Sequence, residues 1–325
     1  MPTTPDRSLL TTLPMHPAFS VIFLTTLIGV GQGFFVALYA AEVGTRLEWL
    51  PMQEPNFYAV GSLIAFMFLA AGLFASFFHL GRPERAWRAA AMWRTSWLSR
   101  EVIVLPAFMA IVLCYAVLHY VGFGGTIAVG AIGIVTCMAV FVCTAMIYAC
   151  IRFLQEWATP LTLSNFMLLG AASGYTLAAA YARINAPPLT GTYAKWAIVF
   201  TLLALCSRLV TLARNARIRP KSSLQTAIGV KHPRIEQKAQ GFIGGSFNTR
   251  EFFHRRPASV VRAVKWGFLL LTFPVPMALL AGAFAGASTL VVAAFVVQYS
   301  GLVAERWFFF AQARHPQNLY YQAMS

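Results

Sequence analysis

The stretch FFHLGRPERAWRAAAMWRTSWLSRE, residues 77–101, joins two long apolar segments and contains no long apolar run itself. His79 lies where the first apolar segment ends, and Glu101 lies where the second one begins. Two membrane helices joined by such a connection return the chain to the side that it left, so both side chains are expected at one membrane face. The stretch therefore predicts a membrane hairpin with an imidazole and a carboxyl group close to the same surface.

The composition of the whole chain agrees with a membrane protein. Of its 325 residues, 58% are hydrophobic and only 11% are charged. The net charge of +15 first suggests a nucleic-acid partner, but the charges lie in loops between apolar runs, so membrane topology explains them and no nucleic acid is expected. Nucleotide-binding loops, paired catalytic carboxylates and cysteine metal motifs are absent from the sequence.

Apolar runs of membrane-spanning length predict the fold class. We expect an all-α integral membrane protein with eight transmembrane helices, arranged as two four-helix bundles within a single membrane domain over residues 1–325. The N-terminal apolar run is too long for a signal peptide and is kept as a mature helix. The expected spans are residues 18–41, 57–78, 102–121, 126–150, 161–182, 193–213, 264–284 and 287–304.

The distribution of Lys and Arg predicts the orientation of these spans. The side that carries both termini has 22 of the 25 Lys and Arg residues, including thirteen between Arg208 and Lys265. The other side has Arg46, Arg183 and Lys195, together with Glu42, Glu48 and Glu54. Because cytoplasmic loops are enriched in Lys and Arg, both termini and the 79–101 and 214–258 loops are expected on the cytoplasmic side of a bacterial inner membrane.

The 214–258 loop is the longest predicted connection, and it contains the Gly- and Phe-rich segment FIGGSFNTREFF at residues 242–253. Charge alone would suffice to orient the chain and to attract lipid headgroups. The aromatic and glycine residues favour a folded surface that docks a protein partner. The residues expected to form this docking surface are Gly244, Gly245, Phe247, Asn248, Arg250 and Phe252.

His79 and Glu101 are the residues that we expect to carry chemistry. An imidazole titrates near neutral pH, so His79 could bond a quinone carbonyl and move a proton, or it could cap the last carbonyls of its helix. Ser99 is a plausible N-cap for the next helix, and a carboxylate in the first turn is favoured by the helix dipole, which is the structural interpretation of Glu101. Its functional interpretation is proton transfer to or from a quinone.

Two further residues belong to this hypothesis, and two other classes of protein compete with it. Arg82 either assists at the quinone site or contacts lipid phosphates, and Gln32 either reaches the quinone or forms a hydrogen bond between helices. A surface haem held by His16 and His79 is an alternative, although no His pair lies deep in the bundle. A transporter is the other alternative, but the predicted spans contain few ionisable residues near mid-membrane.

Four segments together resemble a known family: HPAFSVIFLTTLIGVGQG (16–33), SFFHLGRPERAWRA (76–89), WLSREV (97–102) and GGSFNTREFFH (244–254). The chain is similar over essentially its whole length to the membrane anchor subunits of the dimethyl sulfoxide reductase family, which includes anchors of cytoplasmic sulfite dehydrogenases. The resemblance implies an eight-helix anchor that binds ubiquinone or menaquinone and holds no haem or metal. His79 and Glu101 match the family's quinone-site His and Glu.

The resemblance also implies partners. A four-cluster iron–sulfur subunit would dock on the anchor and would in turn contact a molybdopterin catalytic subunit. The predicted cytoplasmic position of the His79 and Glu101 face favours a cytoplasmic catalytic partner, and hence sulfite oxidation that feeds electrons into the quinone pool. The alternative within the family is an anchor that oxidises quinol for the reduction of dimethyl sulfoxide or another S- or N-oxide.

Overall fold

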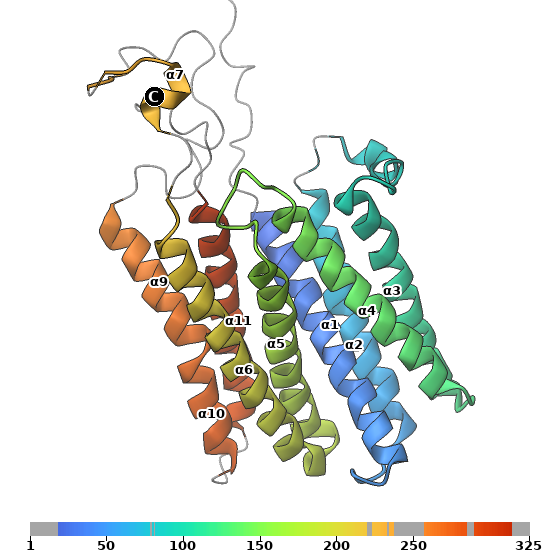
Figure 1. The fold of residues 1–325 in the computed structure, drawn as a ribbon. Helices are drawn as coiled ribbons and strands as arrows, with labels where there is room; N and C mark the ends of the chain where they lie inside the picture. Colours follow the sequence, from blue (N-terminus) through green and yellow to red (C-terminus); the bar gives the residue numbers. More distant parts are fainter. Residues whose placement is uncertain are drawn as a thin grey trace, which may run out of the picture.

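The computed structural model describes residues 19–78, 80, 82–219, 223–232, 234–236, 257–284 and 289–313. Within these ranges the regular structure is helical, and the long helices run side by side as a bundle (Figure 1). We refer to the end where α3 begins as the upper end and to the end where α3 finishes as the lower end. The elements are α1 (Phe19–Arg46), α2 (Pro55–Phe77), η2 (Pro83–Ala90), α3 (Trp97–Val121), α4 (Thr126–Ala149), α5 (Pro160–Asn185), α6 (Pro187–Ala216), α7 (Leu224–Ile228), α9 (Ala258–Thr272), α10 (Pro274–Phe284) and α11 (Leu290–Ala311).

Seven segments of the described chain are long and apolar enough to cross a membrane: α1, α2, α3, α4, α6, the pair α9 and α10, and α11. The molecule is therefore a helical membrane protein, as the sequence predicts. Helix α5, at 26 residues, is as long as these segments but contains more polar residues. It packs between α1 and α6, where most of its surface is covered by protein, so it needs less apolar side-chain surface than a lipid-facing helix.

A close contact between α1 and α5 joins the first and second halves of the chain. A Cβ atom at Gly33 would overlap the carbonyl oxygen of Gly170, and one at Gly174 would overlap the backbone of Gly33. Small residues at these positions let the two backbones approach each other, as is common between membrane helices. A continuous buried core extends from α1 to α11 around this contact, so the two predicted groups of four helices pack directly against each other.

Three helices extend beyond the predicted spans, and these differences correct the sequence-based boundaries. Helix α1 continues to Arg46 and includes Glu42, while α11 continues to Ala311 and includes Glu305 and Arg306. Arg208, which the charge count assigned to a loop, lies inside α6 and is fully buried. Hydropathy ended each span at its first charged residue, but a helix can continue wherever its charged side chains find partners inside the protein.

The prolines of the seventh span interrupt it as expected. Helix α9 ends at Thr272 and α10 begins at Pro274, with Phe273 between them at φ −117° and ψ −79°. Proline has no backbone N–H to donate and its ring crowds the preceding turn, so the helix breaks just before it.

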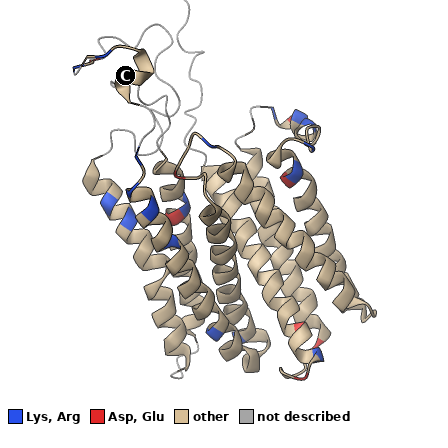
Figure 2. Ribbon diagram, in the orientation of Figure 1, with Lys and Arg blue, Asp and Glu red and all other residues tan. Residues whose placement is uncertain are grey.

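The connection between α2 and α3 lies at the upper end, where η2 crosses beyond the start of α3 (Figure 1). Ser96, and not Ser99, is the N-cap of α3, because the Ser96 hydroxyl accepts a hydrogen bond of 3.3 Å from the Ser99 backbone N–H. The Arg100 side chain donates to the carbonyl oxygens of Trp93 and Arg94, at 2.9 and 2.8 Å, and folds the connection against the helix. Figure 2 shows that the basic residues concentrate at this end of the bundle.

Candidate functional site

Glu101 lies in the second turn of α3 at the upper end of the bundle, and its side chain is buried at 6% exposure. Its carboxylate accepts a hydrogen bond from the hydroxyl of Thr144 on the neighbouring helix α4. In the described part of the chain it has no ion-pair partner within 4.0 Å. A buried carboxyl group with a single hydroxyl donor is poorly compensated when it is charged, so its environment favours proton uptake.

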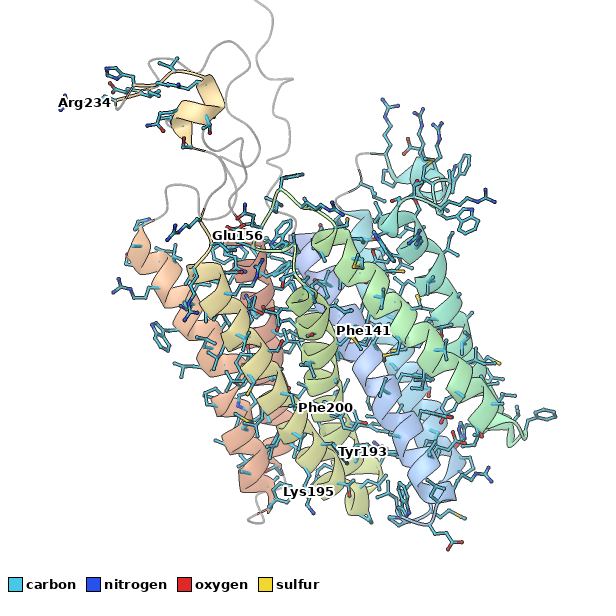
Figure 3. The ribbon with its side chains drawn as sticks, viewed as in Figure 1. Phe141, Glu156, Tyr193, Lys195, Phe200 and Arg234 are labelled. Carbon is cyan, nitrogen blue, oxygen red and sulfur yellow. The ribbon has the colours of Figure 1, made fainter. Side chains whose placement is uncertain are left out.

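The hydroxyl of Thr144 also lines a narrow crevice between α1, α4, α5 and α11. Gln32 and Arg306 line the same crevice, together with apolar side chains that include Phe141 and Phe166. In Figure 3 the labelled Phe141 lies nearer the upper end than Tyr193 and Lys195 do. The crevice has a volume of about 10 Å³, which is enough for about one water molecule.

Gln32 fulfils the structural alternative and also faces the crevice. Its amide Nε2 donates a 3.0 Å hydrogen bond to the carbonyl oxygen of Cys137 on α4, and the side chain is 2% exposed. The structure thus brings two of the residues predicted for the quinone site, Glu101 and Gln32, to a single polar crevice, where Glu101 is connected through Thr144.

The other predicted residues are not part of this arrangement. Arg82 precedes η2 with an exposed side chain, so it does not join the buried crevice. His79 lies outside the described residues, as does the predicted haem alternative of His16 with His79. The six predicted docking residues also lie outside the described ranges: Gly244, Gly245, Phe247, Asn248, Arg250 and Phe252.

A buried ionic cluster adjoins the crevice, and the sequence contains little sign of it. Arg208 of α6 places its Nε 2.9 Å from Oε1 of Glu305 on α11, and both side chains are almost completely buried. The Nε of Arg306 lies 3.9 Å from Oε2 of Glu305. The guanidinium of Arg306 also covers the ring of Phe166, with 3.7 Å between Cζ and the ring centroid. Arg306 therefore joins the ionic cluster to the crevice that it lines.

The cluster explains why charged residues can lie inside the bundle. Charges in a membrane interior persist when they pair with one another and pack on aromatic rings. Removing one member would leave an uncompensated buried charge, so the cluster fixes α6 against α11. The only signals in the sequence were Arg208 within an expected span and Glu305 directly after the end of another.

Comparison with known proteins adds the family context. The model of the DMSO reductase anchor subunit family (DmsC) matches residues 15–232. A sulfite dehydrogenase subunit from Allochromatium vinosum is 56% identical to the chain over 325 residues, which cover 96% of this chain and 100% of that protein. No solved structure matches the chain.

Proposed function

Since the chain belongs to the DMSO reductase anchor subunit family, we propose that it is the quinone-reactive anchor of a molybdopterin and iron–sulfur oxidoreductase that oxidises sulfite. The similarity to a subunit of a sulfite dehydrogenase supports this choice of reaction over the reduction of an S- or N-oxide. Sulfite and water would give sulfate, two protons and two electrons, and a quinone would take up two electrons and two protons to become a quinol.

The observation that carries the proposal is the buried carboxyl of Glu101 with its single hydroxyl donor, Thr144. A carboxyl group in such surroundings can hold a proton and pass it to a nearby acceptor. Glu101 would deliver a proton from its carboxyl oxygen to a carbonyl oxygen of the quinone. Thr144 would keep the carboxyl oriented, and Gln32 and Arg306 would keep the adjoining crevice polar.

The size of the crevice limits where the quinone ring can lie. A volume of about 10 Å³ accommodates a water molecule and not a substituted six-membered ring. The ring would therefore bind outside the crevice, near the connection between α2 and α3, where the sequence also places His79. A water molecule in the crevice would then link Glu101, through Thr144, to the polar interior.

The proposed topology follows from the charge distribution and the helix count. With α5 as the eighth span, both termini lie at the upper end, which has most of the basic residues and would face the cytoplasm. A four-cluster iron–sulfur subunit would dock at this end through the 214–258 loop and contact a molybdopterin subunit. Replacing residues 241–254 with a Gly/Ser linker is expected to release that subunit from the membrane, and its retention would count against the docking surface.

The proposal is tested by comparing the complex with and without this chain. Both preparations should oxidise sulfite with an artificial soluble electron acceptor, but only the complex that contains the chain should reduce quinone. Equal quinone reduction by both preparations would refute the proposed role. Transport of a solute by the purified chain in vesicles, without any partner, would favour the transporter alternative.

A further inference from the structure

A second buried carboxyl group, Glu42, lies in α1 near the lower end of the bundle, opposite to Glu101. Its side chain is 4% exposed. The carboxylate accepts hydrogen bonds of 2.5 Å from the Tyr115 hydroxyl of α3 and from the Thr126 hydroxyl of α4. His119 of α3 places its Nε2 3.5 Å from Oε1 of the same carboxylate. Three polar side chains from two other helices therefore surround Glu42.

The imidazole of His119 is held against Glu42 by aromatic rings. The ring of Tyr58 from α2 stacks on it with 4.8 Å between centroids, and Tyr115 packs edge-on at 4.6 Å. The side chain is 8% exposed, and its Nε2 has no hydrogen-bond partner within the described residues. An imidazole nitrogen this close to a buried carboxylate forms an ion pair as soon as the ring is protonated.

The pair has a short connection to the lower surface through Thr126. The same Thr126 that donates to Glu42 also lines a pocket of about 420 Å³. Arg46 and Leu47, which are exposed, form part of the wall of this pocket. Water in the pocket would need to cross only one hydroxyl group to reach the carboxylate.

An apolar layer separates this pair from the crevice at the upper end. Along α1, Phe34, Phe35 and Leu38 lie between Gln32 and Glu42, and all three are fully buried. Phe35 packs edge-on against Phe108 and Tyr115, with ring centroids 5.5 and 5.4 Å apart. A closely packed aromatic layer offers no polar groups to a chain of water molecules, so it separates the protons of the two ends.

From this geometry we propose that Glu42 and His119 form a proton-binding site that exchanges with water at the lower end of the bundle through Thr126. The two groups bind one proton as a unit because they lie so close together. The proton resides on the imidazole, while the two hydroxyl donors stabilise the carboxylate in its charged form. The site is independent of the proposed quinone chemistry, which lies on the other side of the aromatic layer.

The groups around the pair are consistent with one exchangeable proton. Each neighbouring hydroxyl has a partner of its own: Tyr39 donates to the Ile127 carbonyl oxygen at 3.2 Å and Tyr193 to the Ala37 carbonyl oxygen at 3.3 Å. The titratable or charged side chains near the pair, from all the elements packed around it, are Tyr39 and Arg46 of α1, Tyr58 of α2, Tyr115 of α3 and Tyr193 of α6. Tyrosine is neutral at physiological pH, so the imidazole is the group that changes charge.

The test uses the full chain in its complex, reconstituted in lipid nanodiscs and labelled with ¹⁵N in the histidine rings. Ring-nitrogen shifts distinguish charged from neutral imidazole. The chain has six histidines, and His119→Gln assigns one signal by its loss, while His232→Gln removes the signal of an exposed histidine as a control. Should His119→Gln not fold, a chain in which the other five histidines are replaced leaves His119 as the remaining signal.

We expect the His119 signal to change from charged to neutral as the pH is raised from about 5 to about 9. In Glu42→Gln the charged fraction at a given pH should fall, because the carboxylate that stabilises it is gone. In oriented vesicles the signal should follow a pH change on the lower side only. A His119 signal that stays in one form throughout in the wild-type protein, or that follows a pH change on the upper side, would overturn the proposal.

Discussion

The two buried carboxyl groups at opposite ends of the bundle have contrasting surroundings. Glu101 at the upper end accepts one hydrogen bond, from Thr144. Glu42 at the lower end accepts two hydroxyl hydrogen bonds and faces an imidazole. The number of donors around a buried carboxylate determines how well its charge is stabilised. The contrast assigns proton transfer to Glu101, and it assigns to Glu42 the fixing of three helices and of the imidazole beside it.

The largest expected difference between the two sites is in turnover. Glu101→Gln removes the carboxyl proton and should lower sulfite-dependent quinone reduction by about 100-fold or more, because a positioned acid or base contributes about that much. Glu84→Gln, an exposed carboxylate of the same end that lies 4.0 Å from Arg85, is the matched control and should leave the rate unchanged. Equal rates in wild type and Glu101→Gln would remove the functional distinction between the two carboxyl groups.

Stability should show the opposite order. Glu42→Ala leaves the hydroxyls of Tyr115 and Thr126 without their acceptor, and it should lower the free energy of unfolding by about 1–3 kcal/mol. Glu101→Ala leaves only the Thr144 hydroxyl unpaired and should have a smaller effect. Thermal unfolding of the two variants in the same detergent makes the comparison, and a larger loss for Glu101→Ala would contradict it.

The smallest expected effect concerns the crevice. Gln32→Leu should slow quinone reduction about fivefold, which corresponds to the loss of about one hydrogen bond in the water connection to Glu101. Gln298→Leu is the matched control, since Gln298 also donates to neighbouring helices but does not line the crevice. Steady-state rates of the two variants separate a role in the crevice from a role in helix packing, and equal slowing would leave only the packing role.

The helical membrane fold was readable from the sequence, because long apolar runs have few alternatives to a helix in lipid. Glu101 was identified because it begins a span directly after a charged connection. Glu42, Arg208, Glu305 and Arg306 were missed as buried groups, since a charged residue at the edge of an apolar run looks like a loop residue.

Pairs of residues were harder to predict than single residues. Glu42 and His119 lie on different helices and far apart in the sequence, and only the packing of α1 against α3 and α4 brings them together. Thr144 carries no signal by itself, because a threonine inside an apolar helix usually bonds to its own backbone. The crevice depends on four helices, so no local pattern could have indicated it.

The central claim is that quinone binds at the upper end, beside Glu101, and it is tested most directly by photoaffinity labelling of the complex with an azido-quinone, followed by peptide mapping. We expect the label on peptides from the end of α2 and the start of α3, around residues 76–105, and we expect an excess of natural quinone to prevent it. Labelling confined to the lower end, around Glu42, His119 and Thr126, would contradict the claim.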